Sequence, residues 1–187
     1  GEGAFKGCSI VSSINFGKNI TNIGECALQG CSNLQSVYWN IAVDSVVSPF
    51  YNHNSYDNFD LRPQITSFTF GDDVKSIPDY LCSNMSLSTV SIPDNVTSIG
   101  DEAFKDCSKL TSVTLGKNVK KIGQGAFLED SVLTSVHYQG TLSDWVNIDF
   151  EGYDMDQYWD DQQNKGANPL EFADSLFINN SYVTDIT

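Results

Sequence analysis

The chain has 187 residues and a formal net charge of −14 at pH 7, with 24 Asp and Glu against ten Lys and Arg. Proteins that bind nucleic acid neutralise phosphates with Lys and Arg, so this acidic excess argues against a nucleic-acid partner. No apolar run approaches the roughly 18–20 residues that cross a bilayer, and we expect no membrane insertion of this segment. The five cysteines include no C-x-x-C spacing, so they indicate neither a zinc cluster nor a thioredoxin-type motif.

A repeat of 22 or 23 residues runs through most of the chain. The run "IGDEAFKDCSKLTSVTLGKNVKK" begins at Ile99, and "IGQGAFLEDSVLTSVHYQG" begins 23 residues later at Ile122. Earlier copies begin at Ile77 and Ile23, and the first residues of the chain are a copy that lacks only its leading Ile. One copy cannot bury its own apolar side, so we expect the copies to stack and share one core.

Each copy contains a β-type segment of the form L-x-x-V-x-L. In residues 110–115, Val113 and Leu115 point to one face, whereas Ser112 and Thr114 point to the other. Stacked copies pair these segments as neighbouring strands about 4.8 Å apart. The predicted strands are residues 11–16, 34–39, 65–70, 87–92, 110–115 and 133–138, and residues 182–187 start another.

A segment of the form G-x-x-A-F-x-x-C completes each copy and is too short for a stable free helix. We expect it to form about one turn, with Ser76–Asp79 and Ser98–Asp101 as capping boxes. Phe104 is predicted to point into the core from this convex side.

The cysteines follow the repeat rather than a pairing scheme. Cys107 recurs as Cys8 and Cys31, and two other copies place Met85 and Asp130 at the same position. A disulfide or a metal ligand would not tolerate that exchange, so we interpret the position as a small packing site. Cys26 falls outside this register, and we expect it to be an exposed thiol.

The combination of "VTSIGDEAF", a Cys three residues after the Phe, and "LTSVTL" resembles the BspA-like (treponemal-type) leucine-rich repeat family. The resemblance covers nearly the whole chain. It implies an α/β leucine-rich repeat solenoid, with about seven stacked short parallel strands on one face and short helices or turns on the other. We interpret residues 1–187 as a single repeat array, cut from a longer one. Members of the family are typically secreted or surface proteins of host-associated microbes, implicated in adhesion.

Residues 40–64 depart from the repeat, because the strands at 34 and 65 lie 31 residues apart. This irregular insertion is rich in Asn and in aromatic residues, including Tyr51 and Tyr56. Two interpretations remain open. It is either a degenerate repeat with its aromatic side chains packed on the convex side or a binding loop, since long insertions are often functional.

Residues 139–180 form a second irregular region, which we interpret as an extended repeat. Thr141 and Asp144 form a capping-box pattern ahead of a short helix. That helix places Leu142, Trp145 and Ile148 on one face, where we expect them to join the core.

An acidic stretch within this region crowds carboxylates around Tyr158 and Trp159. Oxygen ligands at alternate positions suit Ca²⁺, and the weak candidates are Asp154, Asp156 and Asp160. The Gly at position six and the closing Glu of an EF-hand loop are absent, so no metal site is assigned.

The outward side of the predicted strands carries mostly Ser and Thr, a flat surface of low specificity. Tyr38 and His137 are the exceptions, and such side chains make better binding anchors. The two histidines, His53 and His137, belong to no recognised catalytic pattern, and no glycine-rich phosphate loop follows a strand. We therefore expect neither an enzyme nor a cofactor.

The resemblance favours an extracellular or cell-surface protein that binds a host or microbial surface protein. The alternatives are a passive spacer and a carbohydrate-binding module acting through its aromatic-rich insertions. The candidate partner-binding residues are Tyr38, His137, Tyr51, Tyr56, Tyr158 and Trp159. Because repeat arrays normally need polar caps at their ends, we also predict end-to-end self-association.

Overall fold

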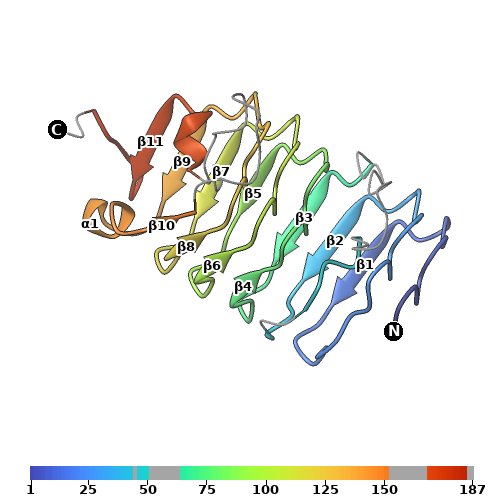
Figure 1. The fold of residues 1–187 in the computed structure, drawn as a ribbon. Helices are drawn as coiled ribbons and strands as arrows, with labels where there is room; N and C mark the ends of the chain where they lie inside the picture. Colours follow the sequence, from blue (N-terminus) through green and yellow to red (C-terminus); the bar gives the residue numbers. More distant parts are fainter. Residues whose placement is uncertain (44–45, 51–63, 152–167, 185–187) are drawn as a thin grey trace, which may run out of the picture.

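A computed structural model of the chain describes residues 1–43, 46–50, 64–151 and 168–184. Successive coils stack along one axis, and the two termini lie at opposite ends of the stack (Figure 1). One side of the stack carries a row of parallel strands and the other carries turns, which confirms the predicted solenoid.

Seven of the strands form the main row, one from each coil. They lie parallel and in repeat register, so that Ser112 of one strand faces Ser135 of the next. The six predicted strands that precede residue 140 are confirmed. The members of the row are β1 (Ser13–Phe16), β2 (Ser36–Trp39), β3 (Ser67–Phe70), β5 (Thr89–Ser91), β7 (Ser112–Leu115), β9 (Ser135–Tyr138) and β11 (Ser175–Ile178).

The last strand of the row is not the one predicted. β11 pairs parallel with β9, and β12 (Ser181–Tyr182) then turns back and pairs antiparallel with β11. Asn179 and Asn180 both have positive φ, 47° and 64°, which suits the tight turn of a β-hairpin. The prediction that a further repeat strand starts at residue 182 is therefore wrong for the described residues, and residues 185–187 lie outside them.

A second, narrower sheet runs beside the first and was not predicted. It consists of the two-residue parallel strands β4 (Ser76–Ile77), β6 (Ser98–Ile99), β8 (Lys121–Ile122) and β10 (Asp149–Phe150). Each of the first three buries an isoleucine, the leading residue of a copy. The same isoleucines that mark the repeat in the sequence therefore anchor this sheet to the core.

The segments after these strands are turns because two residues in each of five described copies adopt left-handed backbone angles. The first such position holds Gly3, Cys26, Tyr80, Glu102 and Gly125, and the second holds Gly7, Gly30, Asn84, Asp106 and Glu129. A right-handed helix cannot continue through a residue with positive φ. The described residues contain only two short helices, α1 (Leu142–Trp145) and the 3₁₀ helix η1 (Pro169–Glu171).

The capping boxes predicted at Ser76–Asp79 and Ser98–Asp101 are wrong. Both serines belong to strands, and the two carboxylates bond to the following coil instead. Asp79 Oδ1 accepts the N–H of Asp101 at 2.9 Å, and Asp101 Oδ1 accepts the N–H of Gln124 at 2.8 Å. The capping box of Thr141 and Asp144 is confirmed at the start of α1.

Backbone hydrogen bonds also join the turns of adjacent coils. The N–H groups of Tyr80, Cys82 and Asn84 donate to carbonyls of the next coil at 2.7–2.9 Å. Phe104 N–H donates to Ala126 O in the same way at 2.8 Å. The coils of β5 and β7 are therefore held by three ladders, one in each sheet and one along the turns, whereas the coils of β1 and β2 are joined in the main row and along the turns.

The core lies between these three ladders and contains a chain of aromatic rings. Phe104 is fully buried, as predicted, and stacks on Phe127 with ring centroids 5.3 Å apart. Trp145 and Ile148 of the α1 region join the core, which confirms their predicted burial. Leu142 does not, since 39% of its surface is exposed at the start of the helix.

The repeated cysteine position is buried in Cys31, Met85, Cys107 and Asp130, which confirms it as a packing site. All five cysteines lie in the described residues, and none forms a disulfide. The Cys107 thiol also has a polar role, because its S–H donates to Cys82 O at 3.2 Å. Cys26 is not an exposed thiol: its left-handed turn places it in the core with 6% exposure.

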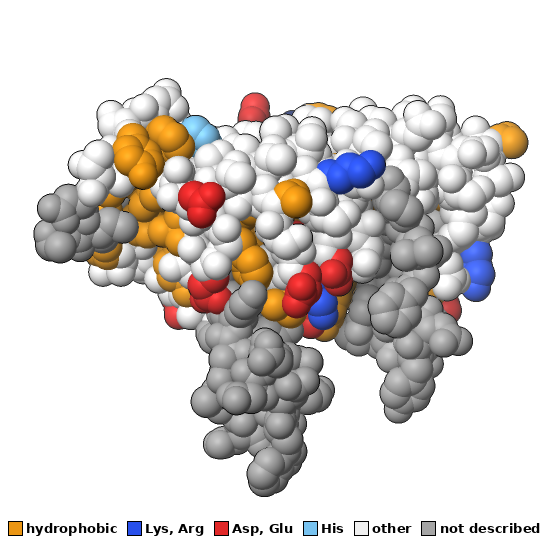
Figure 2. Space-filling model, turned by 90° about the horizontal axis from the view of Figure 1, so that it is seen from above, with side chains coloured by type: hydrophobic (Ala, Val, Ile, Leu, Met, Phe, Trp, Pro, Cys, Tyr) orange, Lys and Arg blue, Asp and Glu red, His pale blue; other side chains and the backbone are white. Residues whose placement is uncertain are grey.

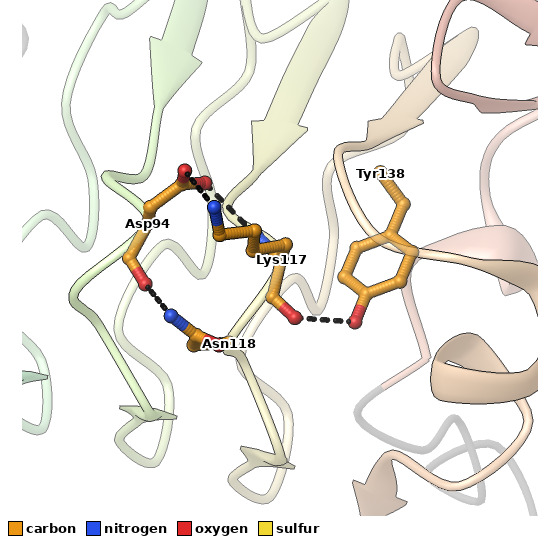
Figure 3. A network of polar contacts seen from close by, with 4 residues as sticks. All are labelled: Asp94, Lys117, Asn118 and Tyr138. Atoms are coloured by element: carbon orange, nitrogen blue, oxygen red, sulfur yellow. Dashed lines mark hydrogen bonds and ion pairs between the residues drawn. The ribbon is translucent and has the colours of Figure 1, made fainter.

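Polar side chains connect the turns that follow the strands of the main row (Figure 3). Asn118 Nδ2 donates to Asp94 O at 2.8 Å, and Tyr138 Oη donates to Lys117 O at 2.9 Å. Asp94 Oδ1 accepts the N–H of Lys117 at 3.1 Å, and this bond holds the pKa of Asp94 below its usual value. The same Asn position is used again where Asn95 Nδ2 donates to Asp72 O.

Replacing Asn118 by alanine should lower the free energy of unfolding by about 0.5–1.5 kcal/mol, because one inter-coil hydrogen bond at the surface is lost. Urea denaturation of both proteins measures the difference. Asn19 occupies the same repeat position in the first coil and is likewise exposed, but no inter-coil hydrogen bond joins its side chain to the described residues, so Asn19→Ala is the matched control and should change stability less. Equal losses in both variants would contradict a role for the inter-coil bond.

Candidate interaction surface

The outward side of the main row of strands, here called the strand face, is a nearly flat polar surface. Burial alternates along the strands as predicted, so that in β3 Phe68 and Phe70 are buried while Ser67 and Thr69 are exposed. The strand face consists of Ser13, Asn15, Ser36, Tyr38, Ser67, Thr69, Thr89, Ser91, Ser112, Thr114, Ser135, His137, Ser175 and Phe177. None of these side chains is a carboxylate, Lys or Arg, so specificity depends on shape and on the few large side chains.

An aromatic row occupies the C-terminal end of the strand face, formed by His137, Phe177 and Tyr182. Register places Phe177 beside His137 on one side and beside Tyr182 on the other. The His137 and Phe177 rings are stacked, with centroids 4.5 Å apart and an interplanar angle of 7°. The Tyr182 ring is tilted by 55° at 5.4 Å from Phe177 and is 54% exposed.

A space-filling view shows hydrophobic side chains gathered at one end of the molecular surface (Figure 2). In this view a histidine side chain, coloured pale blue, lies beside a group of hydrophobic side chains at one end of the molecule. Much of the rest of this view is white, the colour of the backbone and of side chains that are neither charged nor hydrophobic. The aromatic row is thus an apolar patch on a polar face.

Only His137 of this row was a candidate from the sequence. Phe177 and Tyr182 were missed because the strand was predicted to begin at residue 182, and β11 instead begins at Ser175. The alternation of "SLFI" in residues 175–178 was the available signal, but Ala173 stands at the opening position where the other β segments have Leu, Ile or Val.

Tyr38 lies on β2, toward the opposite end of the strand face from His137 on β9. It is 37% exposed, and its hydroxyl and the Asn40 side chain together occupy the space that a side chain at position 71 would need. Gly71 therefore lets the Tyr38 ring lie across the end of its neighbouring strand. The two sequence candidates do not form one site.

A groove separates two blocks of the strand face. β1, β2 and β3 form one sheet, and β5, β7, β9, β11 and β12 form another, with no pairing between β3 and β5. The groove has a volume of about 490 Å³. The side chains along it include Ser67, Thr69, Thr89 and Ser91, with Asp72 and Pro93 at one end.

The remaining sequence candidates lie outside the described residues. They are Tyr51, Tyr56, Tyr158 and Trp159, together with the weak Ca²⁺ candidates Asp154, Asp156 and Asp160. Among the residues that are described, no group of three or more His, Cys, Asp and Glu side chains is arranged to hold a metal ion. Nor does any helix in the same part of the chain have the length and apolar character to span a bilayer.

Two crystal structures share this architecture. A leucine-rich cell surface protein from Faecalibacterium prausnitzii A2-165 is 22% identical, with a TM-score of 0.61, over 74% of this chain and 35% of that protein. A leucine-rich repeat protein from Bacteroides ovatus ATCC 8483 is 28% identical, with a TM-score of 0.54, over 76% of this chain and 37% of that protein. This chain thus spans little more than a third of either relative's length. No curated protein sequence matches it.

The family model of the BspA type leucine-rich repeat region matches residues 1–69 and 57–155, in six copies. Together these matches cover the coils from the first turn to the end of the second sheet, where the stacked ladders, the buried isoleucines and the repeated cysteine position occur. The chain therefore belongs to the BspA type leucine-rich repeat family.

Proposed function

We propose that this chain is a non-enzymatic protein-binding module that is secreted or displayed at the cell surface and mediates adhesion to a host or microbial surface protein. Membership of the leucine-rich repeat family supports binding to proteins, and the similarity to a cell surface protein of Faecalibacterium prausnitzii supports display. The single observation that carries the proposal is the aromatic row on the strand face.

Aromatic side chains at the centre of an interface contribute most to binding when polar neighbours exclude water around them. On one side the aromatic row has such polar neighbours, because serine and threonine residues of β7 and β9 lie beside it. Stacking of His137 on Phe177 also fixes both rings before a partner arrives, which reduces the conformational entropy lost on binding.

The ring geometry favours a protein partner over a sugar at this site. A pyranose ring packs against an open aromatic face, but the facing sides of His137 and Phe177 cover each other at 4.5 Å. The stacked pair therefore offers the solvent mainly ring edges, which suit aliphatic and aromatic side chains of a protein.

Replacing Phe177 by alanine should weaken binding at least about thirtyfold, the effect of losing a hot-spot residue worth about 2 kcal/mol. Biolayer interferometry against immobilised host matrix proteins and mucin, followed by adhesion of the bound protein to epithelial cells, measures the change. His137→Ala should weaken binding to the same partner. Tyr38→Ala, at the other end of the strand face, is the matched control and should keep the affinity of the unchanged protein.

Two other outcomes lead to different functions. A protein that binds none of these surfaces, and whose role depends only on the length of the array, is a passive spacer. Binding to glycans that disappears on mutation of Tyr51, Tyr56, Tyr158 or Trp159 indicates a carbohydrate-binding module instead. End-to-end self-association would broaden the proposal to contacts between copies and is visible as concentration-dependent sedimentation.

A further inference from the structure

A pocket of about 440 Å³ lies beside α1, at the ends of β7, β9 and β11. In the preceding coil an asparagine of the turn reaches back to the turn before it, since Asn118 Nδ2 donates to Asp94 O at 2.8 Å. Thr141 holds this repeat position after β9, but it begins α1 and bonds to Asp144 instead. The ladder of turns therefore ends here, and the pocket occupies the space beside Asn118.

Tyr138 is fully buried and supports the pocket from the core side. Its Oη donates at 2.9 Å to Lys117 O, the carbonyl that an asparagine at position 141 would otherwise bond (Figure 3). Its ring meets Trp145 edge-on at 5.6 Å, and a Cβ added to Gly140 would lie 2.5 Å from that ring. The base of the pocket is thus fixed by packing and by a hydrogen bond, and it does not depend on a ligand for its shape.

Three asparagine side chains of the pocket lining are held in place by their own hydrogen bonds. The Nδ2 groups of Asn118, Asn147 and Asn179 each donate to a backbone carbonyl, at 2.8, 2.6 and 2.9 Å. Among the described residues no donor bonds to their Oδ1 atoms, and an amide oxygen has two lone pairs. The lining therefore carries three acceptors whose side chains lose little conformational freedom when a ligand binds.

Other side chains of the lining supply donors and charge. Gln139 is partly buried, and its side-chain amide makes no hydrogen bond to the described residues. Lys120 is exposed and takes part in none of the ion pairs within the described part of the chain. Asp144 adds a carboxylate, whose pKa lies below its usual value because the hydroxyl and the N–H of Thr141 donate to it. Donors and acceptors thus line the same space.

The chemistry of the lining selects the kind of ligand. Lysines disfavour a metal ion, and the Asp144 carboxylate together with the amide oxygens disfavours an anion. The apolar side chains of the lining, Val119 and Tyr138, are buried, so an apolar ligand would gain little. A hydroxyl both donates and accepts, so a ligand with several hydroxyls matches a lining of mixed donors and acceptors. These groups together favour an uncharged saccharide.

We propose that the pocket at the ends of β7, β9 and β11 binds a sugar unit, whose hydroxyls donate to the three asparagine oxygens and accept from the Gln139 amide. The volume of about 440 Å³ falls within the range of about 300–1,000 Å³ common for ligand sites. No exposed aromatic ring of the described residues lines the pocket for stacking, so we expect millimolar affinity. This site shares no residue with the aromatic row and does not rest on the function proposed there.

Saturation-transfer difference NMR tests this site on the full 187-residue chain. The probes are glucose, galactose, mannose, fucose, N-acetylglucosamine and N-acetylgalactosamine, each as the methyl glycoside and as the free sugar. At least one should bind with millimolar affinity, and mannitol should bind at least about tenfold more weakly, because its open chain loses more conformational freedom. A preference for the methyl glycoside identifies the end of a glycan chain as the ligand, and a preference for the free sugar identifies a monosaccharide.

Variants of the protein locate the binding. Asn147→Ala and Gln139→Ala should each weaken the best sugar at least about threefold, and the double variant at least about tenfold, because each change removes a hydrogen bond. Asn15→Ala removes an exposed asparagine of β1, away from the pocket, and should change nothing. Thermal melts of each variant separate a lost site from a lost fold. Phe177→Ala should also leave sugar binding intact, so a failure here is distinguishable from a failure of the aromatic row.

The site is overturned if none of the sugars binds at millimolar concentration. Unchanged affinity in the folded double variant, or mannitol binding as tightly as the best sugar, would also contradict it. Chemical-shift changes at Asn147 and Gln139 with inorganic phosphate or Ca²⁺, and none with the sugars, would assign the pocket to an ion instead.

Discussion

Replacing Asp130 by asparagine should raise the melting temperature at pH 7 by about 8–16 °C and leave it nearly unchanged at pH 4. Asp130 stands at the repeated cysteine position and is fully buried. Its Oδ1 accepts the N–H of Cys107 at 2.8 Å, and its Oδ2 has no hydrogen-bond partner. The pKa of this carboxyl is raised from 3.8 to about 9, mainly because burial disfavours its charged form.

The pH dependence follows from this raised pKa. Between pH 4 and pH 9 the folded chain keeps Asp130 protonated while the unfolded chain releases the proton, so the free energy of unfolding falls by about 1.4 kcal/mol per pH unit. At pH 7 the free energy of unfolding is therefore roughly 4 kcal/mol lower than at pH 4. Asparagine keeps an acceptor for the Cys107 N–H and cannot ionise, so its advantage exists at neutral pH and vanishes in acid.

Thermal melts monitored by circular dichroism at pH 4 and pH 7 measure both effects. Glu129→Gln removes the adjacent but exposed carboxylate and serves as the control, with little expected change at either pH. A rise in melting temperature that is the same at pH 4 and pH 7 would show that Asp130 is ionised in the fold or that packing alone accounts for the gain.

Replacing Phe104 by alanine should lower the free energy of unfolding by about 3–5 kcal/mol, because a large cavity opens in the centre of the array. Phe104 is fully buried, stacks on Phe127 at 5.3 Å, and meets Phe70 edge-on with centroids 6.3 Å apart. The ring therefore connects three successive coils, and its loss weakens contacts on both sides.

Phe5 provides a matched control, because it occupies the same repeat position in the first coil but is 44% exposed. Phe5→Ala should cost less than about 1 kcal/mol, as is usual for changes at an exposed site. Chemical denaturation of the two variants against the unchanged chain gives both values. Similar costs at the two positions would mean that repeat position, rather than burial, determines the contribution of this ring.

The architecture was predictable because each copy of the repeat carries the same pattern of apolar and polar residues. Val113, Leu115 and their counterparts alternate with Ser and Thr in each copy, which determines both the strand positions and the inward face. The turns were less predictable. Gly3 and Gly125 signal the first left-handed position, but Cys26, Tyr80 and Glu102 occupy it in other copies and carry no such signal.

The candidate sites were predictable only in part, since they arise where the repeat changes. His137 was identified because it replaces a hydroxyl at a repeat position, whereas Phe177 lies beyond a 40-residue step from β9 to β11 that the period does not predict. The groove depends on which strands pair, and the sequence pattern of β3 and β5 resembles that of strands that do pair.

The three ladders between coils also determine how the array responds to mechanical load. Their hydrogen bonds join one coil to the next, so tension applied between the two ends acts on them directly. Coils would then detach one after another, each releasing about 23 residues and up to about 80 Å of chain. A surface protein built in this way would lengthen stepwise under shear while its remaining coils keep their shape.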